Sequence, residues 1–331
     1  MSKKPLPSTM PQKKEPEKKK IKVGKIIIIT VIIMIVALLI TWLTLGITKA
    51  SSLLNPERNG LAYIDGPAEI GMVYETFELK NFNGDDNIVG WWIPSQDGEG
   101  EYVESNKTII FSHNYQSNRE MRETDGLFLV RYLVWSGYNV ITFDYTGSGN
   151  SKGKNYTFGV DEKDELKLVV DYACDVREQS SIALYGFAFG SAAAIVEGCG
   201  DERISVIIAD SPYLDLESAL FDNLSTWSNL PNFIFSPIIE PMMNIFAGEK
   251  LEISPYDAVM SSSGKSFLFL HGEADTYFPS ENSSVLSKAA EESGNYSEYT
   301  VFPDARHEYS FVDSEDNYVN TVTAFLEEHF N

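Results

Sequence analysis

The strongest constraint on this chain is an uncharged apolar run near its N-terminus, IIIITVIIMIVALLITWLTLGI, from Ile26 to Ile47. As a helix rising about 1.5 Å per residue, the run would span about 33 Å, enough to cross a bilayer. Lysines crowd the preceding residues, so the positive-inside rule predicts a cytoplasmic N-terminus and everything after Thr48 outside. We therefore predict a basic cytoplasmic tail at 1–25 and one transmembrane helix at 26–47.

A cleavable signal peptide is the competing interpretation of the same run. Its apolar region would be shorter, about 7–15 residues, and would end in a small-residue cleavage site. Thr48-Lys49-Ala50 is a poor version of that site. The length of the apolar run and the residues that flank it favour an uncleaved anchor at the cell membrane, with an extracytoplasmic domain.

Charge is unevenly distributed along the chain. The formal net charge is -22, and residues 1–25 hold nine lysines and two glutamates, so the rest carries -29. Such an acidic body would repel phosphates, which argues against a nucleic-acid partner and against lying flat on an anionic membrane. We interpret the charge as keeping the domain soluble.

The two cysteines and the motif content exclude some classes of site. Cys174 and Cys199 lack metal-site spacing. Outside the cytosol they could form a disulfide or remain buried thiols, and both alternatives stay open. No cofactor motif is present, so we expect neither a cofactor nor a metal.

Short apolar runs alternate with helical patterns after a stalk or lead-in at 48–70. The runs are rich in Ile, Val, Leu and Phe, which is typical of strands buried on both faces. They are Met72–Leu79, Ile88–Ile93, Thr108–Ser112, Asn139–Phe143, Ile182–Tyr185, Ser205–Ala209, Ser266–Leu270 and Glu298–Phe302, and the helical patterns fall at 162–175, 191–198, 281–292 and 316–329. The alternation predicts an α/β domain at 71–331.

Residues 213–257 interrupt this alternation. They are rich in aromatic residues, prolines and methionines, as in WSNLPNFIFSPIIEPMMNIF. An apolar insertion between strands often forms a lid over a binding cleft, whereas a core-packing excursion is the alternative. We expect a lid, because of its position relative to the motifs below.

The strand at 182–185 leads into Gly186-Phe187-Ala188-Phe189-Gly190 and a run of small residues. This is the frame of a nucleophile elbow, G-x-S-x-G, in which glycines let the strained backbone pass close to its neighbours. The central side chain is held above the sheet, and the Phe189 N–H would face a substrate oxyanion. Ala188 stands at the centre, and a methyl group cannot attack a carbonyl.

Two further segments follow later strands. Asp275 lies in Phe269-Leu270-His271-Gly272-Glu273-Ala274-Asp275, and His307 ends Phe302-Pro303-Asp304-Ala305-Arg306-His307. Elbow, then Asp, then His is the chain order of the α/β-hydrolase triad. In that triad the His takes the nucleophile's proton, and the Asp fixes the His tautomer.

With these segments assembled, the chain resembles the α/β-hydrolase superfamily, in particular its bacterial membrane-anchored, serine-peptidase- and monoglyceride-lipase-like members. The match spans about 70–331 and includes the segments 111–115, 118–120, 144–151, 210–213 and 254–258. The resemblance implies the α/β-hydrolase fold: a mostly parallel sheet with helices on both faces and a helical lid. It also implies a second oxyanion donor, the backbone N–H of Tyr115.

Three residues depart from the family pattern. Ala188 replaces the serine. Asn114 replaces the usual glycine of the oxyanion loop, and we expect the loop to persist because Asn tolerates positive φ. Thr146 replaces the usual arginine after Asp144. Ser191, one helical turn past Ala188, is a poor substitute nucleophile because it should lie below the elbow.

Several residues also have a purely structural interpretation. His113 and His271 are expected to shape turns beside the cleft. Without a serine, Asp275 and His307 could persist as a pair that merely holds two loops.

Three functions remain open at this point. The first is a non-catalytic protein, impaired or inactive as a hydrolase, that binds an acyl, lipid or peptide ligand or a protein partner. The second is an active esterase- or peptidase-like serine hydrolase, whose serine was replaced by alanine or which uses another nucleophile. The third is a structural domain with an unused cleft, which side chains filling that cleft would favour.

Overall fold

The computed structural model describes residues 23–63, 65–81, 84 and 87–330, so most of the predicted basic tail lies outside the described residues. The chain divides into two compact units, one up to Leu45 and one from Gly46 onward. The first consists, as described, of helix α1, which runs Val23–Leu54 and continues into the second unit. It is long and apolar enough to cross a membrane. The helix extends beyond the expected end at Ile47.

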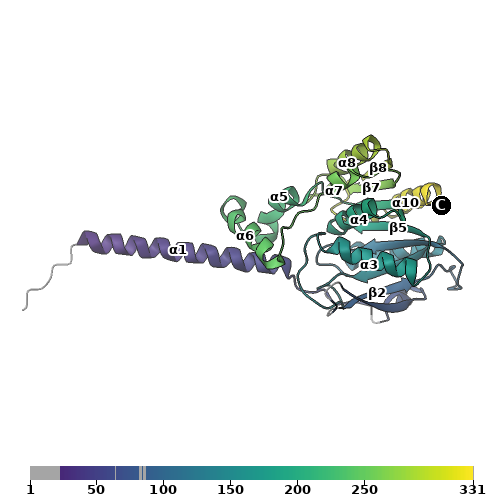
Figure 1. Ribbon diagram of the computed structural model, residues 1–331, viewed down its shortest axis with the longest axis horizontal. Helices are drawn as coiled ribbons and strands as arrows, with labels where there is room; N and C mark the ends of the chain where they lie inside the picture. The colour runs from purple at the N-terminus through teal and green to yellow at the C-terminus, as the bar shows by residue number, and fades with distance from the viewer. Residues whose placement is uncertain (1–22, 64, 82–83, 85–86, 331) are drawn as a thin grey trace, which may run out of the picture. The chain divides into compact units, whose positions relative to one another are not determined.

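The second unit is built on a sheet in the order β1-β2-β4-β3-β5-β6-β7-β8. Figure 1 labels β2, β5, β7 and β8 of this sheet. The strands are β1 (Glu75–Lys80), β2 (Asn87–Ile93), β3 (Lys107–Ser112), β4 (Asn139–Asp144), β5 (Ser181–Phe187), β6 (Ile204–Asp210), β7 (Ser266–Gly272) and β8 (Tyr296–Phe302). The pairs β1–β2 and β2–β4 are antiparallel, and the other neighbours are parallel. The predicted α/β-hydrolase fold is confirmed.

Helices cover both faces of this sheet. Ile208 of β6 belongs to the core cluster that includes residues of α2 (Gly126–Trp135) and α10 (Glu315–His329). Its neighbour Ile207 lies against Gly198 of α4 (Phe189–Gly200). Adjacent strand residues point to opposite faces, so these two sets of helices lie on opposite sides. The sequence predicts α4 and α10, and it also predicts α3 (Glu162–Asp175) and α8 (Glu281–Glu292). It does not predict α2.

The insertion at 213–257 forms α5 (Leu216–Ser228), α6 (Asn232–Ala247) and the start of α7 (Pro255–Met260). α7 returns to the body of the domain, where it packs with α4 and α8. Short helical segments complete the chain: η1 (Gly66–Ile70), η2 (Arg122–Thr124) and α9 (Ser310–Asp313). The predicted helical insertion is thus present.

The two cysteines are free. Cys174 lies on α3 and Cys199 on α4, and both are partly buried. Burial raises the pKa of the Cys199 thiol to about 11, so this thiol is protonated at neutral pH. Of the two alternatives from the sequence, the structure has the unpaired thiols.

Candidate active site

The turn from β5 to α4 places Ala188 in a strained conformation, with φ 45° and ψ −110°. Positive φ is rare for a residue with a Cβ and is found where function requires a particular side-chain direction. The flanking glycines permit the close approach: a Cβ on Gly186 would overlap the Ser191 backbone, and one on Gly190 would overlap the Ser112 carbonyl. The local backbone is therefore that of a nucleophile elbow, with a methyl group at its centre.

Ser191 does not offer a replacement oxygen. Its side chain is fully buried, and its hydroxyl donates to the Ala188 carbonyl at 2.5 Å. The hydroxyl is thus engaged with the elbow's own backbone.

Asp275 and His307 meet above the ends of neighbouring strands. Asp275 follows β7 and His307 follows β8, and the Asp275 Oδ2 atom lies 2.6 Å from His307 Nδ1. The other carboxylate oxygen accepts the backbone N–H groups of Tyr277 and Phe278 at 2.8 and 2.9 Å. This is the contact that would fix the histidine tautomer and leave Nε2 free of Asp275.

Opposing effects set the charges of this pair. Burial raises the pKa of Asp275, but hydrogen bonds from His271 and His307 outweigh it and hold the pKa of that carboxyl below its usual range. Burial lowers the pKa of His307, but the Asp275 hydrogen bond and the charge of Glu308 outweigh it and raise the pKa above the ordinary value. The pair therefore favours an ionised carboxylate beside a histidine that readily holds a proton.

Two further histidines, His113 and His271, hold the surrounding turns. His271 Nε2 lies 3.2 Å from Asp275 Oδ2, and its Nδ1 lies 2.9 Å from the Ser283 hydroxyl. His113 accepts the Tyr145 N–H at 3.1 Å, and burial lowers its pKa to about 4, so it is neutral. Both contacts fit the structural interpretation of these residues.

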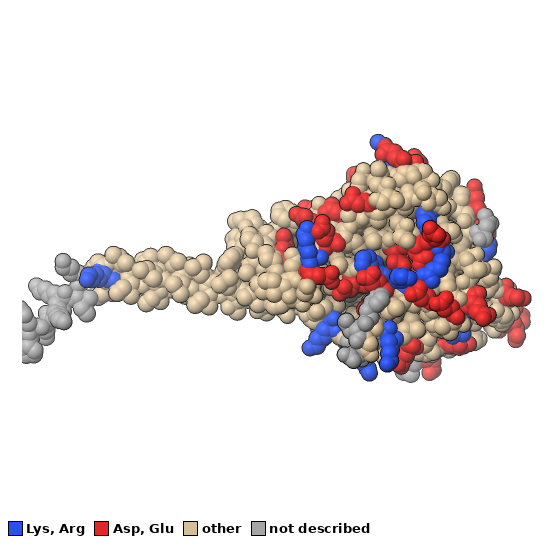
Figure 2. Space-filling model, in the orientation of Figure 1, with Lys and Arg blue, Asp and Glu red and all other residues tan. Residues whose placement is uncertain are grey.

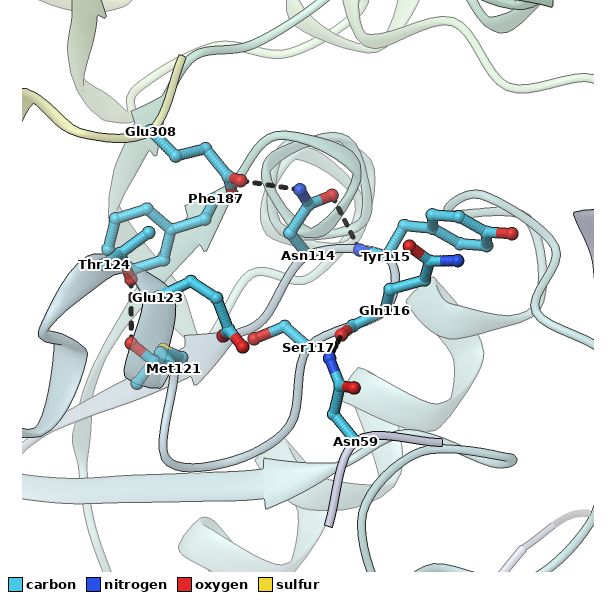
Figure 3. A pocket seen from close by; sticks show the side chains of 10 residues that line it. All are labelled: Asn59, Asn114, Tyr115, Gln116, Ser117, Met121, Glu123, Thr124, Phe187 and Glu308. Carbon is cyan, nitrogen blue, oxygen red and sulfur yellow. Dashed lines mark hydrogen bonds between the residues drawn. The ribbon is translucent and has the colours of Figure 1, made fainter. Parts of the chain in front are cut away.

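The two expected oxyanion donors are already engaged. The Asn114 side-chain oxygen accepts the backbone N–H of Tyr115 at 2.6 Å (Figure 3) and that of Phe189 at 3.3 Å. Its side-chain NH₂ donates to Glu308 at 2.7 Å. Two N–H donors on one atom identify that atom as the amide oxygen. The side-chain carbonyl of Asn114 thus occupies the position where a substrate oxyanion would lie.

Asn114 reaches this position without the backbone conformation we expected. Positive φ occurs not at Asn114 but at Gln116, with φ 58°. The expectation that Asn was tolerated here for its φ is therefore wrong. The amide group itself makes the contacts at this position.

Glu308 was not anticipated from the sequence. Burial raises the pKa of its carboxyl to about 7, partly offset by the charge of His307 and the Asn114 hydrogen bond. It lies 3.8 Å from His307 Nε2. Glu308 thus links the histidine to the amide that occupies the oxyanion donors.

A cavity of about 270 Å³ opens beside His307. Its lining is mostly apolar and aromatic: Leu53, Asn114, Tyr115, Gln116, Phe189, Trp227, Tyr277, Phe278 and His307. Trp227 comes from the insertion, and its ring packs 5.6 Å from that of Phe189. Ala188 itself has no exposed surface. The insertion therefore covers the elbow but leaves room for a small ligand group, which argues against a completely filled cleft.

Thr146 contacts the buried carboxyl group of Glu165. The backbone N–H of Thr146 donates to Glu165 at 2.8 Å, and burial raises the pKa of Glu165 to about 8. Nearby, Arg119 and Asp144 form a fully buried ion pair at 2.6 Å. The oxyanion loop is thus tied to β4 at Asp144. The Glu165 carboxyl beside Thr146 is mostly protonated, and so neutral, at physiological pH.

Residues 128–331 match the model of the prolyl oligopeptidase family. The match covers more than half of the chain and includes Ala188, Asp275 and His307. The chain belongs to this family. The N-terminal strands and the oxyanion loop at Asn114 lie outside the matched range.

The chain has relatives among bacterial and human proteins. The chain is 26% identical over 266 residues to YqkD of Bacillus subtilis, and the match covers 77% of this chain and 82% of that protein. It is 25% identical over 201 residues to the human protein ABHD12B, covering 58% of this chain and 52% of that protein.

Among solved structures, the esterase Pf2001 of Pyrococcus furiosus is similar with a TM-score of 0.69 and 25% identity. The similarity covers 84% of this chain and 99% of the esterase. A puromycin-hydrolysing peptidase of Mycobacterium tuberculosis shares the fold, with a TM-score of 0.60 and 16% identity over 78% of this chain and 40% of the peptidase. The family member is thus related to serine esterases and peptidases.

Proposed function

We propose that this protein is a membrane-anchored, extracytoplasmic member of the family that binds a ligand or partner and is impaired or inactive as a hydrolase. The observation that carries the proposal is Ala188, a methyl group at the centre of an elbow whose backbone conformation is preserved. Loss of the serine from a triad enzyme costs on the order of 10⁶ in turnover, or about 8 kcal/mol of transition-state stabilisation.

Asn114 is a second, independent support. A substrate carbonyl must displace the amide oxygen from the Tyr115 and Phe189 N–H groups before it can be polarised. Oxyanion stabilisation is often the largest single contribution to this chemistry. Because the Asn114 amide occupies both N–H groups, much of the rate enhancement that would otherwise survive the loss of the serine is removed.

The chemistry of the cavity indicates the ligand class. Most of the side chains that line it are aromatic or apolar, and Asn114, Gln116 and His307 supply polar groups. Its volume of about 270 Å³ is near the lower end for small-molecule sites. We infer that it takes an acyl group or an apolar side chain of a lipid or peptide.

The alternative is an active ester or amide hydrolase in which a serine belongs at position 188. The observation that favours it is the intact contact between Asp275 and His307 at 2.6 Å. A histidine with this partner could activate a serine hydroxyl placed at the elbow.

Labelling of the membrane-embedded full chain with a serine-directed phosphonate tests both functions. The protein itself should not label, Ala188→Ser should label, and Ala188→Ser with His307→Ala should lose the gain. Strong labelling of the unaltered chain that Ser191→Ala removes would disprove the non-catalytic function. If Ala188→Ser gains nothing, the site has diverged beyond one residue, which supports a binding role.

A further inference from the structure

Helix α6 is apolar on both of its faces. Toward the domain it buries Phe235, Ile239 and Met243. Its outer face exposes a stripe at every fourth position, which we call the α6 stripe: Phe233, Pro237, Pro241 and Ile245. Phe233 is 82% exposed and Ile245 is 65% exposed. The outer face of a helix on a soluble domain is normally polar, so this stripe calls for an apolar partner.

The helix is almost uncharged along its whole length. Asn232–Ala247 contains a single charged residue, Glu240, which is half-buried. In Figure 2, acidic and basic side chains concentrate over the sheet and its covering helices, and the region around α6 is mostly free of them. On the face that Figure 2 shows, the acidic surface therefore lies mostly away from α6.

The last turns of α1, from Gly46 onward, belong to the same compact unit as α6. Gly46 packs so closely on Ile238 of α6 that a Cβ there would overlap the isoleucine side chain. Gly46 is the penultimate residue of the apolar run that ends at Ile47. The same turns are held to the domain, because the Leu53 carbonyl accepts the Tyr115 hydroxyl at 2.7 Å. α6 thus packs against the residues of α1 at which the apolar run ends.

We propose that the α6 stripe lies in the interfacial region of the membrane that holds α1, with lipid acyl chains as its partner. The proposal rests on the membrane anchor of the proposed function but not on whether the site catalyses a reaction. Apolar insertion by a short helix requires no attraction between the acidic domain and the lipid headgroups. Only the uncharged end of the domain touches lipid, and the acidic remainder stays in water.

The test uses the full chain in phosphatidylcholine vesicles, with Cys174→Ser and Cys199→Ser to remove the native thiols. An environment-sensitive fluorophore is attached at Ile245→Cys. The matched control is Val176→Cys, because Val176 is 64% exposed. Val176 follows α3 and precedes β5, whereas the elbow follows β5, so Val176 lies toward the opposite end of the strands from the elbow. Emission and quenching by nitroxide-labelled lipids are then compared at the two positions.

We expect blue-shifted emission and severalfold stronger lipid quenching at 245 than at 176, and the same result for Phe233→Cys. Equal quenching at all three positions overturns the proposal. A blue shift at 245 without lipid quenching means that protein covers the stripe, which also overturns it. Vesicle flotation and resistance to alkaline extraction are measured first, so failure of the anchor is distinguished from failure of the stripe.

Discussion

The occupied oxyanion donors lead to a quantitative prediction for Asn114→Ala in the Ala188→Ser background. A substrate carbonyl that enters the site must break three contacts of the Asn114 amide, at 2.6, 3.3 and 2.7 Å. At about 1 kcal/mol net for each hydrogen bond, displacement costs about 3 kcal/mol. Each 1.36 kcal/mol is tenfold in rate, so removing the amide should accelerate the reaction about 10²-fold.

The assay measures the rate constant for phosphonate inactivation and the hydrolysis of an activated short-chain ester. Ala188→Ser is compared with the double variant that adds Asn114→Ala. The matched control adds Ser117→Ala instead, since Ser117 lies on the same loop and lines a second cavity together with Asn114 and Glu308 (Figure 3). We expect the control to react like Ala188→Ser alone.

The reasoning fails if Asn114→Ala leaves the rate unchanged or lowers it while the fold is retained. A lower rate would mean that the amide assists the reaction, for instance by donating to the oxyanion. An equal effect of Ser117→Ala would mean that loop mobility, not the displaced amide, governs the rate.

Three further predictions concern stability and topology. Burial raises the pKa of Glu165 from 4.5 to about 8, so folding becomes less favourable as the pH rises from 4.5 to 8. In chemical denaturation, the free energy of unfolding of Glu165→Gln should exceed that of the unaltered chain by up to about 5 kcal/mol at pH 8.5 and should equal it at pH 4. Asp144→Ala leaves Arg119 buried without its partner and should cost about 4 kcal/mol of unfolding free energy, whereas Glu252→Ala, at an exposed pair, should cost under about 0.5 kcal/mol. Protease outside intact cells should digest the domain and spare the lysine tail, and a free soluble domain beginning near Ser51 would contradict the anchor.

The strands could be predicted from the sequence because each is a short apolar run between turn residues. Their ends still moved by up to a few residues, as at Ser181–Phe187 for the expected 182–185. The missed helix, Gly126–Trp135, reads GLFLVRYLVW and is apolar on most of its circumference. Such a segment has no clear helical periodicity, since it is buried among other helices and strands.

The candidate site was only partly readable for a different reason. Chain order and the surrounding motifs suggested Asp275 and His307, which the fold brings to 2.6 Å. The contacts of Asn114 with Phe189 and Glu308 join residues 75 and 194 positions apart. Local patterns carry no information about such contacts. The replaced glycine is the only sequence signal at this position, and it predicts a positive φ that the structure does not have at Asn114.

Asn114 also bears on the origin of the alanine. Replacing a serine to trap substrate would change one residue and leave the oxyanion donors open for the bound carbonyl. Here the amide that fills those donors comes from a different strand end, and Glu308 holds it in place. Glu308 in turn has its pKa raised to about 7 by burial, a cost that an optimised catalytic site would not need for this purpose. Under the proposed function, the two departures, at positions 188 and 114, disable two separate parts of the chemistry. Their coincidence favours a site that lost hydrolysis as a whole over a working enzyme with one substituted atom.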